Sequence, residues 1–134
     1  MSLDPSHVLP IRTSDDVVQV RQRVRSSALE AGLSLVDQTK IVTAASELAR
    51  NTLIYGGGGT MRIEVIADGI KRGVRLTFED QGPGIADIQL ALTDGYTTGN
   101  GLGLGLSGAK RLSNEFSIDS KLGAGTRVTI ARWK

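Results

Sequence analysis

Apolar residues that recur every three or four positions predict two helices in the first half of the chain. The first opens with Ser14 and two aspartates, which suit a helix start, and ends at Gly32. The second opens at Ser34 and ends at Tyr55. The apolar stripes are Val17, Val20, Val24, Ala28 and Ala31 in the first helix, and Ile41, Ala44, Ala45, Leu48 and Thr52 in the second. Each stripe would pack one face of its helix against a core.

Alternation of apolar and polar residues predicts four strands, and a fifth extended piece precedes the helices. Pro10 would confine that first piece to the edge of a sheet. The extended piece is residues 8–13, and the strands are 61–67, 74–80, 116–120 and 126–130. Short turns join the strands into two hairpins with helices between them. This order predicts an α+β fold: a two-layer α/β sandwich with a mixed, mostly antiparallel sheet and helices on one face.

A glycine-rich stretch, residues 99–112, passes from a loop into a helix at about Gly103. Glycines let backbone amides approach an anion closely, and the first turn of a helix has unpaired N–H groups. The stretch is therefore predicted to hold phosphate. The glycines also match the dinucleotide-binding fingerprint, but that motif follows a strand and no strand precedes Gly103. They do not form a P-loop either, because Ala109 stands where a P-loop requires lysine.

Two further segments lie between the first hairpin and the glycine-rich stretch. Residues 85–92 predict a short helix, because Ile85, Ile88 and Leu92 share one face. Residues 93–100 are polar and have no periodicity. They predict a mobile lid next to the phosphate-binding stretch.

Asp80 and Thr126 are polar residues at the ends of apolar strand rows. Asp80 continues the inward alternation of its strand, and residues 81–84 break the strand directly after it. An inward carboxylate needs a hydrogen-bond donor, which either a ligand amine or a backbone N–H of the turn could supply. Thr126 begins the inward row of the last strand, as Asp80 ends the inward row of its own strand. Threonine also favours strands for structural reasons alone, so its position does not require a ligand.

Glu47 and Asn51 lie four residues apart and are therefore stacked on one face of the second helix. A carboxylate and a carboxamide beside an apolar stripe could line a pocket, although exposed polar residues on a surface helix are commoner at such positions. An inward carboxylate, a Gly-x-Gly break and a glycine-rich helix start together suit a purine with a phosphate tail.

Composition narrows the classes of function. The chain of 134 residues is expected to form one domain, 1–134, with a net charge of only +2 and no basic stripe, which argues against a nucleic-acid partner. It has no cysteine, so disulfides and thiolate metal sites are excluded. It shows no membrane-spanning apolar run and no signal peptide, so we expect a cytoplasmic protein without a membrane partner.

Four short motifs stand in the order and spacing of the GHKL ATPase superfamily, which includes gyrase B and the histidine kinases. They are Glu47-Leu-Ala-Arg-Asn51, Asp80-Gln-Gly-Pro-Gly84, Gly101-Leu-Gly-Leu-Gly105 and Gly125-Thr126. Without a recognisable transducer domain or phosphoacceptor helix, the chain resembles the small anti-sigma-factor kinases, above all the switch kinases of the stressosome pathway. The resemblance covers nearly the whole chain. It implies the Bergerat ATP-binding fold, with ATP and Mg²⁺ as ligands.

The resemblance also implies a role for each matching position. Asp80 would accept a hydrogen bond from the adenine amino group, and Thr126 would support the adenine. Asn51 would bind Mg²⁺ through its amide oxygen, and Glu47 would be the general base or would orient the nucleophile. The other nucleotide-binding positions would be Gly82, Gly84, Ile85, Gly101, Leu102, Gly103, Leu104, Gly105 and Leu106.

The implied activity is that of a protein serine/threonine kinase in a stress-response, sigma-factor pathway. It would phosphorylate a STAS-domain antagonist protein and then activate a PP2C-type phosphatase. Two alternatives share the motifs: a nucleotide-gated anti-sigma factor that sequesters a sigma factor, and an ATP-binding module without turnover. A homodimer is left open. Because residues 93–100 contain no Lys or Arg, a partner protein or Arg50 would have to supply positive charge near the γ-phosphate.

Overall fold

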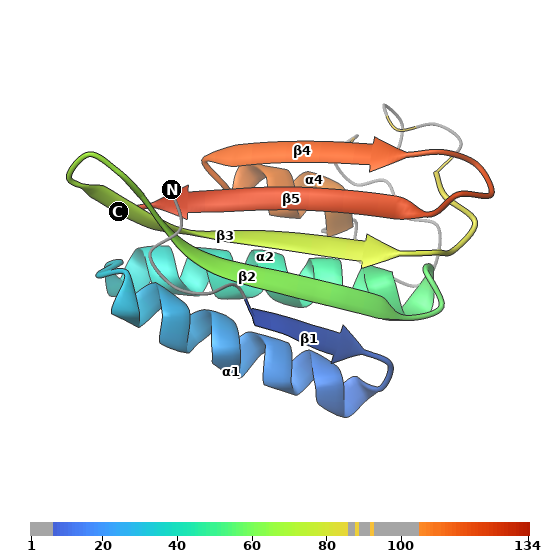
Figure 1. Ribbon diagram of the computed structural model, residues 1–134, viewed down its shortest axis with the longest axis horizontal. Helices are drawn as coiled ribbons and strands as arrows, with labels where there is room; N and C mark the ends of the chain where they lie inside the picture. Colours follow the sequence, from blue (N-terminus) through green and yellow to red (C-terminus); the bar gives the residue numbers. More distant parts are fainter. Residues whose placement is uncertain (1–6, 86–87, 89–91, 93–104) are drawn as a thin grey trace.

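The computed structural model describes residues 7–85, 88, 92 and 105–134. The elements in chain order are β1 (His7–Ile11), α1 (Ser14–Glu30), α2 (Leu35–Ile54), β2 (Gly59–Asp68), β3 (Lys71–Asp80), α4 (Gly105–Arg111), β4 (Glu115–Ser120) and β5 (Thr126–Trp133). The strands form one sheet in the order β1-β2-β3-β5-β4, and every neighbouring pair is antiparallel. The described helices cover one face of it (Figure 1). The predicted two-layer α+β sandwich is confirmed.

Local side chains determine where the two long helices begin. The hydroxyl of Thr13 accepts a hydrogen bond from the N–H of Asp16, and the carboxylate of Asp16 accepts one from the N–H of Thr13. The cap therefore lies one residue before the predicted Ser14. Ser34 caps α2 as predicted, because its hydroxyl accepts a hydrogen bond from the N–H of Asp37. Both predicted helices are confirmed.

Side chains from both layers form one core. Val17 is partly buried at its edge, and the rest of both predicted helix stripes is buried. The sheet contributes its inward rows: Met61, Ile63 and Val65 from β2, Val74, Leu76 and Phe78 from β3, and Val128 and Ile130 from β5. Burying one such side chain contributes about 1.5–3 kcal/mol, so this cluster carries much of the driving force for folding.

The inward rows of three strands end in polar residues, which we call the polar row: Asp80, Thr126 and Ser120. The register pairs Asp80 of β3 with Thr126 of β5, and Thr126 with Ser120 of β4. Gly59 of β2 pairs with Asp80 on the other side. The polar row therefore lies at the end of the sheet where β3 and β4 finish and β5 begins (Figure 1).

An ion pair joins the layers near the other end of the sheet. Arg132 of β5 donates a hydrogen bond of 2.7 Å to Oδ1 of Asp37 in the first turn of α2. It also donates to the carbonyl oxygen of Leu112, just after α4, at 3.3 Å. The hydrogen bond from Arg132 holds the pKa of Asp37 below its usual value, although partial burial opposes this shift.

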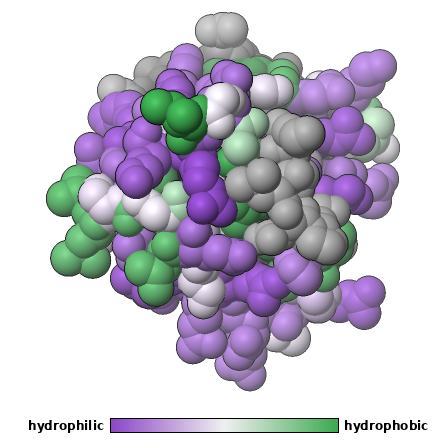
Figure 2. All heavy atoms as spheres, turned by 60° about the vertical axis from the view of Figure 1, so that its left-hand side comes forward, coloured by the Kyte–Doolittle hydropathy of each residue, from purple (hydrophilic) through white to green (hydrophobic). Residues whose placement is uncertain are grey.

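The end of the molecule opposite the polar row is mostly hydrophilic, with apolar side chains scattered across it (Figure 2). Exposed large apolar residues of the described chain include Leu29, Leu35 and Ile70. Scattered apolar residues of this kind are ordinary on a protein surface. None of the helices in the described residues has the length and apolar character needed to cross a membrane.

Candidate functional site

Asp80 is the last residue of β3 and is half-buried at the end of the core. Its Oδ1 accepts a hydrogen bond of 2.9 Å from the backbone N–H of Gly82. Of the two donors that the sequence left open for this carboxylate, a ligand amine or a backbone N–H of the turn, the backbone N–H is present. Within the described part of the chain, no hydrogen bond to Oδ2 is found. That oxygen is the one available to a ligand amine.

Glycines allow three chain segments to meet around Asp80. A Cβ on Gly56, just after α2, would lie 2.6 Å from Oδ2 of Asp80, and a Cβ on Gly82 would lie 2.8 Å from Cα of Gly56. Gly84 has a φ of +78°, and a Cβ there would lie 2.1 Å from the carbonyl oxygen of Lys121. Gly56 was not among the predicted site residues, although a run of four glycines marks its position.

Ser120 connects Thr126 to the turn after Asp80, and sequence reasoning did not identify it as a site residue. Its Oγ accepts a hydrogen bond of 2.8 Å from the backbone N–H of Ile85. The same Oγ lies 2.8 Å from Oγ1 of Thr126 and 3.1 Å from the carbonyl oxygen of Gly125. When Ser120 donates to that carbonyl, Thr126 donates to Ser120, and the free lone pairs of Thr126 are acceptors. Asp80 and Thr126 then both offer acceptors to a ligand that donates hydrogen bonds.

Glu47 and Asn51 lie on α2, one turn apart. The side chain of Glu47 is 22% exposed and forms an ion pair of 3.3 Å with Arg50. Asn51 is half-buried, and a Cβ on Gly105 would lie 3.3 Å from its Nδ2. The carboxamide therefore lies against the first residue of α4, the helix that follows the glycine-rich stretch.

Part of the predicted site falls outside the described residues. These predictions are the phosphate contacts Gly101, Leu102, Gly103 and Leu104, the lid 93–100, the start of the helix at about Gly103 and most of the short helix 85–92. Of the two remaining phosphate positions, Gly105 begins α4 and Leu106 packs partly buried against the core.

The donor set near Asn51 fits a magnesium ion that arrives with a nucleotide. No group of three or more His, Cys, Asp or Glu residues in the described ranges could hold a metal by itself. Mg²⁺ in ATP sites takes most of its oxygen ligands from phosphates and water, and only one or two from protein. The amide oxygen of Asn51 on α2 matches that requirement.

Comparison with known proteins identifies the family. Residues 36–134 match the family described as histidine kinase-, DNA gyrase B-, and HSP90-like ATPase. The chain belongs to this ATPase family. It is 49% identical over 123 residues to serine/threonine-protein kinase RsbT of Bacillus subtilis (strain 168), covering 92% of each chain. The predicted superfamily and its resemblance to this type of kinase are confirmed.

A more distant relative and a solved structure agree with this assignment. The chain is 33% identical over 119 residues to the anti-sigma F factor of Anoxybacillus flavithermus, covering 82% of this chain and 80% of that one. The crystal structure of the RsbU and RsbW domains of Rv1364c from Mycobacterium tuberculosis matches with a TM-score of 0.65. At 23% identity that match supports the fold alone. It covers 98% of this ATPase and 33% of the longer chain.

Proposed function

We propose that this ATPase-family chain is a serine/threonine-protein kinase that transfers the γ-phosphoryl group of ATP to a hydroxyl of a STAS-domain antagonist protein. The observation that carries the proposal is the position of Asn51, one turn after the carboxylate of Glu47 and against Gly105 at the start of α4. A candidate base and a candidate magnesium ligand thus lie together beside the predicted phosphate site. The 49% identity to serine/threonine-protein kinase RsbT supports the same activity.

Nucleotide recognition in this proposal uses the polar row. The adenine amino group donates to Oδ2 of Asp80, while Gly82 holds Oδ1 in place. Thr126 supports the adenine through the lone pairs left after it donates to Ser120. A hydrogen bond to a carboxylate contributes about 1.5–3 kcal/mol, so Asp80 provides much of the selectivity for adenine.

The chemical step moves a phosphoryl group from ATP to the acceptor oxygen. As that oxygen bonds to the γ-phosphorus, Glu47 takes its proton, and ADP leaves with the electron pair of the broken bond. Mg²⁺, when bound, neutralises phosphate charge. Asn51 contributes one ligand oxygen to it. Arg50, which pairs with Glu47 at 3.3 Å, is the basic residue that we assign to the γ-phosphate side of the site.

The biological role that we propose is partner switching in sigma-factor regulation. Phosphorylation releases the kinase from its STAS-domain antagonist, and the freed kinase then binds and activates a PP2C-type phosphatase. The chain acts as a single ATPase domain, residues 1–134, in the cytoplasm, without nucleic-acid or membrane partners. The second role is binding rather than chemistry, so it depends on surfaces outside the nucleotide site.

A second candidate function is that of an anti-sigma factor. The 33% identity to an anti-sigma F factor over 82% of the chain favours it. Both candidates use the same nucleotide site and differ in the partner protein. Retention of a sigma factor in the presence of ADP or ATP, with no phosphoryl transfer to any STAS-domain protein, would support this alternative.

The experiment that tests the kinase proposal uses Glu47→Gln, which keeps the size of the side chain and removes the base. We expect the variant to bind ADP with nearly wild-type affinity and to lose at least about 100-fold in the rate of transfer to a STAS-domain protein. Loss of ADP binding would instead make Glu47 a ligand or a structural residue. Unchanged transfer would remove Glu47 from the mechanism.

A further inference from the structure

The hydroxyl of Ser120, at the end of β4, has three close partners. Its Oγ accepts a hydrogen bond of 2.8 Å from the backbone N–H of Ile85, and it lies 3.1 Å from the carbonyl oxygen of Gly125. Oγ1 of Thr126 lies 2.8 Å from the same atom. A serine hydroxyl has one proton and two lone pairs, so it can donate once and accept twice. The three partners therefore use the whole hydrogen-bonding capacity of Ser120.

These contacts fix the direction of the Thr126 hydroxyl. The N–H of Ile85 can only donate and the carbonyl of Gly125 can only accept, so the two contacts use one lone pair and the proton of Ser120. All three contacts are hydrogen bonds only when Thr126 donates to the lone pair that is left. The proton of Thr126 is then directed at Ser120, and its own lone pairs remain for a ligand.

The carboxylate beside Thr126 also offers only acceptors. Asp80 pairs with Thr126 in the register of β3 and β5, and its Oδ2 has no hydrogen bond within the described residues. An ionised carboxylate has no proton to give. These two side chains therefore offer a ligand several acceptors and no donor.

Purine bases differ in the group that they present to such a pair of acceptors. Adenine has an amino group at C6, which donates, whereas hypoxanthine and guanine have a carbonyl oxygen at C6, which accepts. A carbonyl oxygen placed against two acceptors leaves polar groups unpaired and lowers affinity. A freely rotating hydroxyl on Thr126 could turn its proton toward that carbonyl, but the hydrogen bond to Ser120 prevents this rotation.

We propose that Ser120 is a specificity-determining residue, which holds the Thr126 hydroxyl as an acceptor and so favours adenine over bases with a carbonyl at C6. Ser120 acts through Thr126 and is therefore a positioning residue. Because this role requires the base to lie against Asp80 and Thr126, it rests on the proposed function. Ser120 lies outside the four sequence motifs, and its role adds a source of base selectivity to the carboxylate of Asp80.

The test compares Mg-ADP with magnesium inosine diphosphate (IDP), whose base has the C6 carbonyl, by isothermal titration calorimetry on the full chain. We expect the wild type to prefer ADP at least about 100-fold. Ser120→Ala should bind ADP about three- to tenfold more weakly and IDP no more weakly than the wild type does, so the ratio of the two affinities should fall. An equal loss for both nucleotides would mean that Ser120 only holds the turn in place, and it would overturn the assignment, as would a wild type that does not discriminate.

A double-mutant cycle tests whether Ser120 acts through Thr126. Thr126→Val keeps the shape of the side chain and removes its hydroxyl. In that background Ser120→Ala should leave the ratio of ADP affinity to IDP affinity unchanged. If Ser120→Ala lowers the ratio as much as it does in the wild type, Ser120 does not act through Thr126 and the assignment is wrong.

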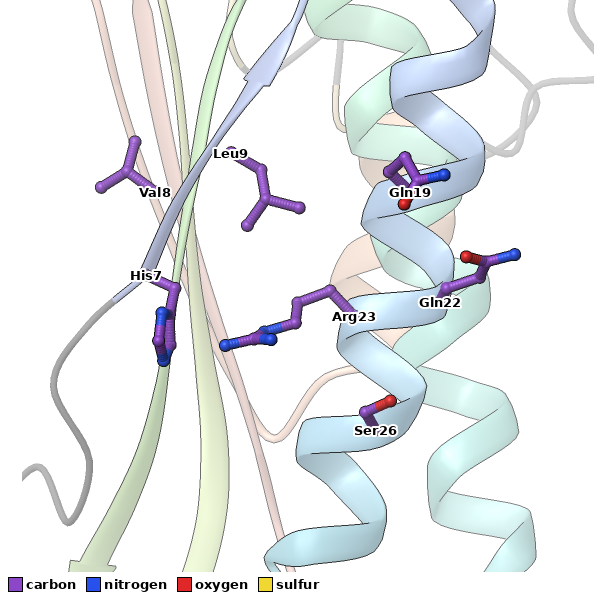
Figure 3. Close-up of a pocket in the computed structure, with 7 residues that line it drawn as sticks. All are labelled: His7, Val8, Leu9, Gln19, Gln22, Arg23 and Ser26. Carbon is purple, nitrogen blue, oxygen red and sulfur yellow. The ribbon is translucent and has the colours of Figure 1, made fainter.

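Two serine controls measure the effect of losing a hydroxyl elsewhere. Ser117→Ala removes one from an exposed position of β4, and Ser26→Ala removes one from an exposed position of α1. Ser26 lines a hollow of about 450 Å³ between β1 and α1, into which Arg23 extends (Figure 3), and the residues found to line that hollow include none of the polar row. Both variants should keep the wild-type affinities for ADP and IDP. A ratio lowered equally in either control would contradict a special role for Ser120.

Two further variants separate one failure from another. If Asp80→Asn leaves ADP affinity unchanged, the proposed nucleotide site is misplaced and the role of Ser120 falls with it. If Asp80→Asn weakens ADP while Ser120→Ala leaves the ratio unchanged, only the role of Ser120 is wrong. Should Ser120→Ala fail to fold, Ser120→Cys takes its place, because a thiol fills a similar space but donates and accepts only weakly. It should lower the ratio too, and an unchanged ratio would overturn the assignment.

Discussion

Replacing Asp80 with asparagine changes the acceptor that we assign to adenine and preserves the contact that holds the side chain. Oδ1 of the asparagine can still accept the 2.9 Å hydrogen bond from the N–H of Gly82. An amide nitrogen replaces Oδ2, which accepts no hydrogen bond from the described residues. A ligand amine would then face a donor in place of a charged acceptor. The variant should therefore fold normally and bind adenine nucleotides poorly.

The expected loss follows from one hydrogen bond to a carboxylate. Such a bond contributes about 1.5–3 kcal/mol, which corresponds to an affinity for ADP about 10- to 150-fold lower. Isothermal titration calorimetry with Mg-ADP measures this change. The free energy of unfolding without nucleotide should change by less than about 1 kcal/mol, because the hydrogen bond from Gly82 remains.

Asp119→Asn is the matched control. It removes the same charge from β4, which β5 separates from β3, at an exposed position outside the polar row, and should leave ADP affinity unchanged. If Asp80→Asn binds ADP as tightly as the wild type, adenine does not bind at Asp80 and the site has been misplaced. If both variants weaken binding equally, the effect is one of net charge.

Three other substitutions test the site and its framework. Ser120→Ala removes the hydroxyl that orders the turn after β3 and should weaken ADP about three- to tenfold without abolishing folding, as calorimetry and thermal unfolding can measure. Gly56→Ala would bring a Cβ to 2.5 Å from Cγ of Asp80, so we expect at least about tenfold weaker ADP binding; unchanged affinity would mean that the carboxylate can move freely. Asp37→Asn should lower the free energy of unfolding by about 1–3 kcal/mol at neutral pH, because it breaks the ion pair with Arg132. The pKa of Asp37 is lowered in the folded state, so the stabilisation by its ion pair is complete above the pKa of Asp in the unfolded chain, near 4, and is lost as pH falls through the folded pKa. Urea titrations from pH 3 to 7 should therefore show the free energies of unfolding of the wild type and Asp37→Asn converging at the acid end. A difference that stays constant with pH would contradict the assignment.

Periodicity predicted the helices and strands because the residues that share one face of a helix or strand lie only a few positions apart in the sequence. The stripe from Val20 to Ala28 and the alternating row from Val74 to Phe78 are buried as expected. The cap of α1 was placed one residue late, because Thr13 and Ser14 are both good capping residues and only the geometry selects between them.

The composition of the polar row could not be predicted in full from local pattern. Ser120 joins Asp80 only because β5 pairs with β3 on one side and with β4 on the other, a register set by the whole sheet. A serine at the end of a strand carries no distinguishing local signal. Gly56 approaches Asp80 through tertiary packing between the end of α2 and the sheet, and the sequence shows there only a run of four glycines.

The measurement that tests the kinase proposal most directly is the intact mass of a STAS-domain protein after incubation with this chain and Mg-ATP. Parallel samples contain the Asp80→Asn variant, or wild-type chain with Mg-ADP. We predict a gain of one phosphoryl group with the wild type and Mg-ATP, a smaller fraction of phosphorylated protein with Asp80→Asn at the same ATP concentration, and no gain with Mg-ADP. An unchanged mass under conditions where ADP binding is demonstrated would contradict the kinase assignment and leave sigma-factor binding as the stronger candidate function.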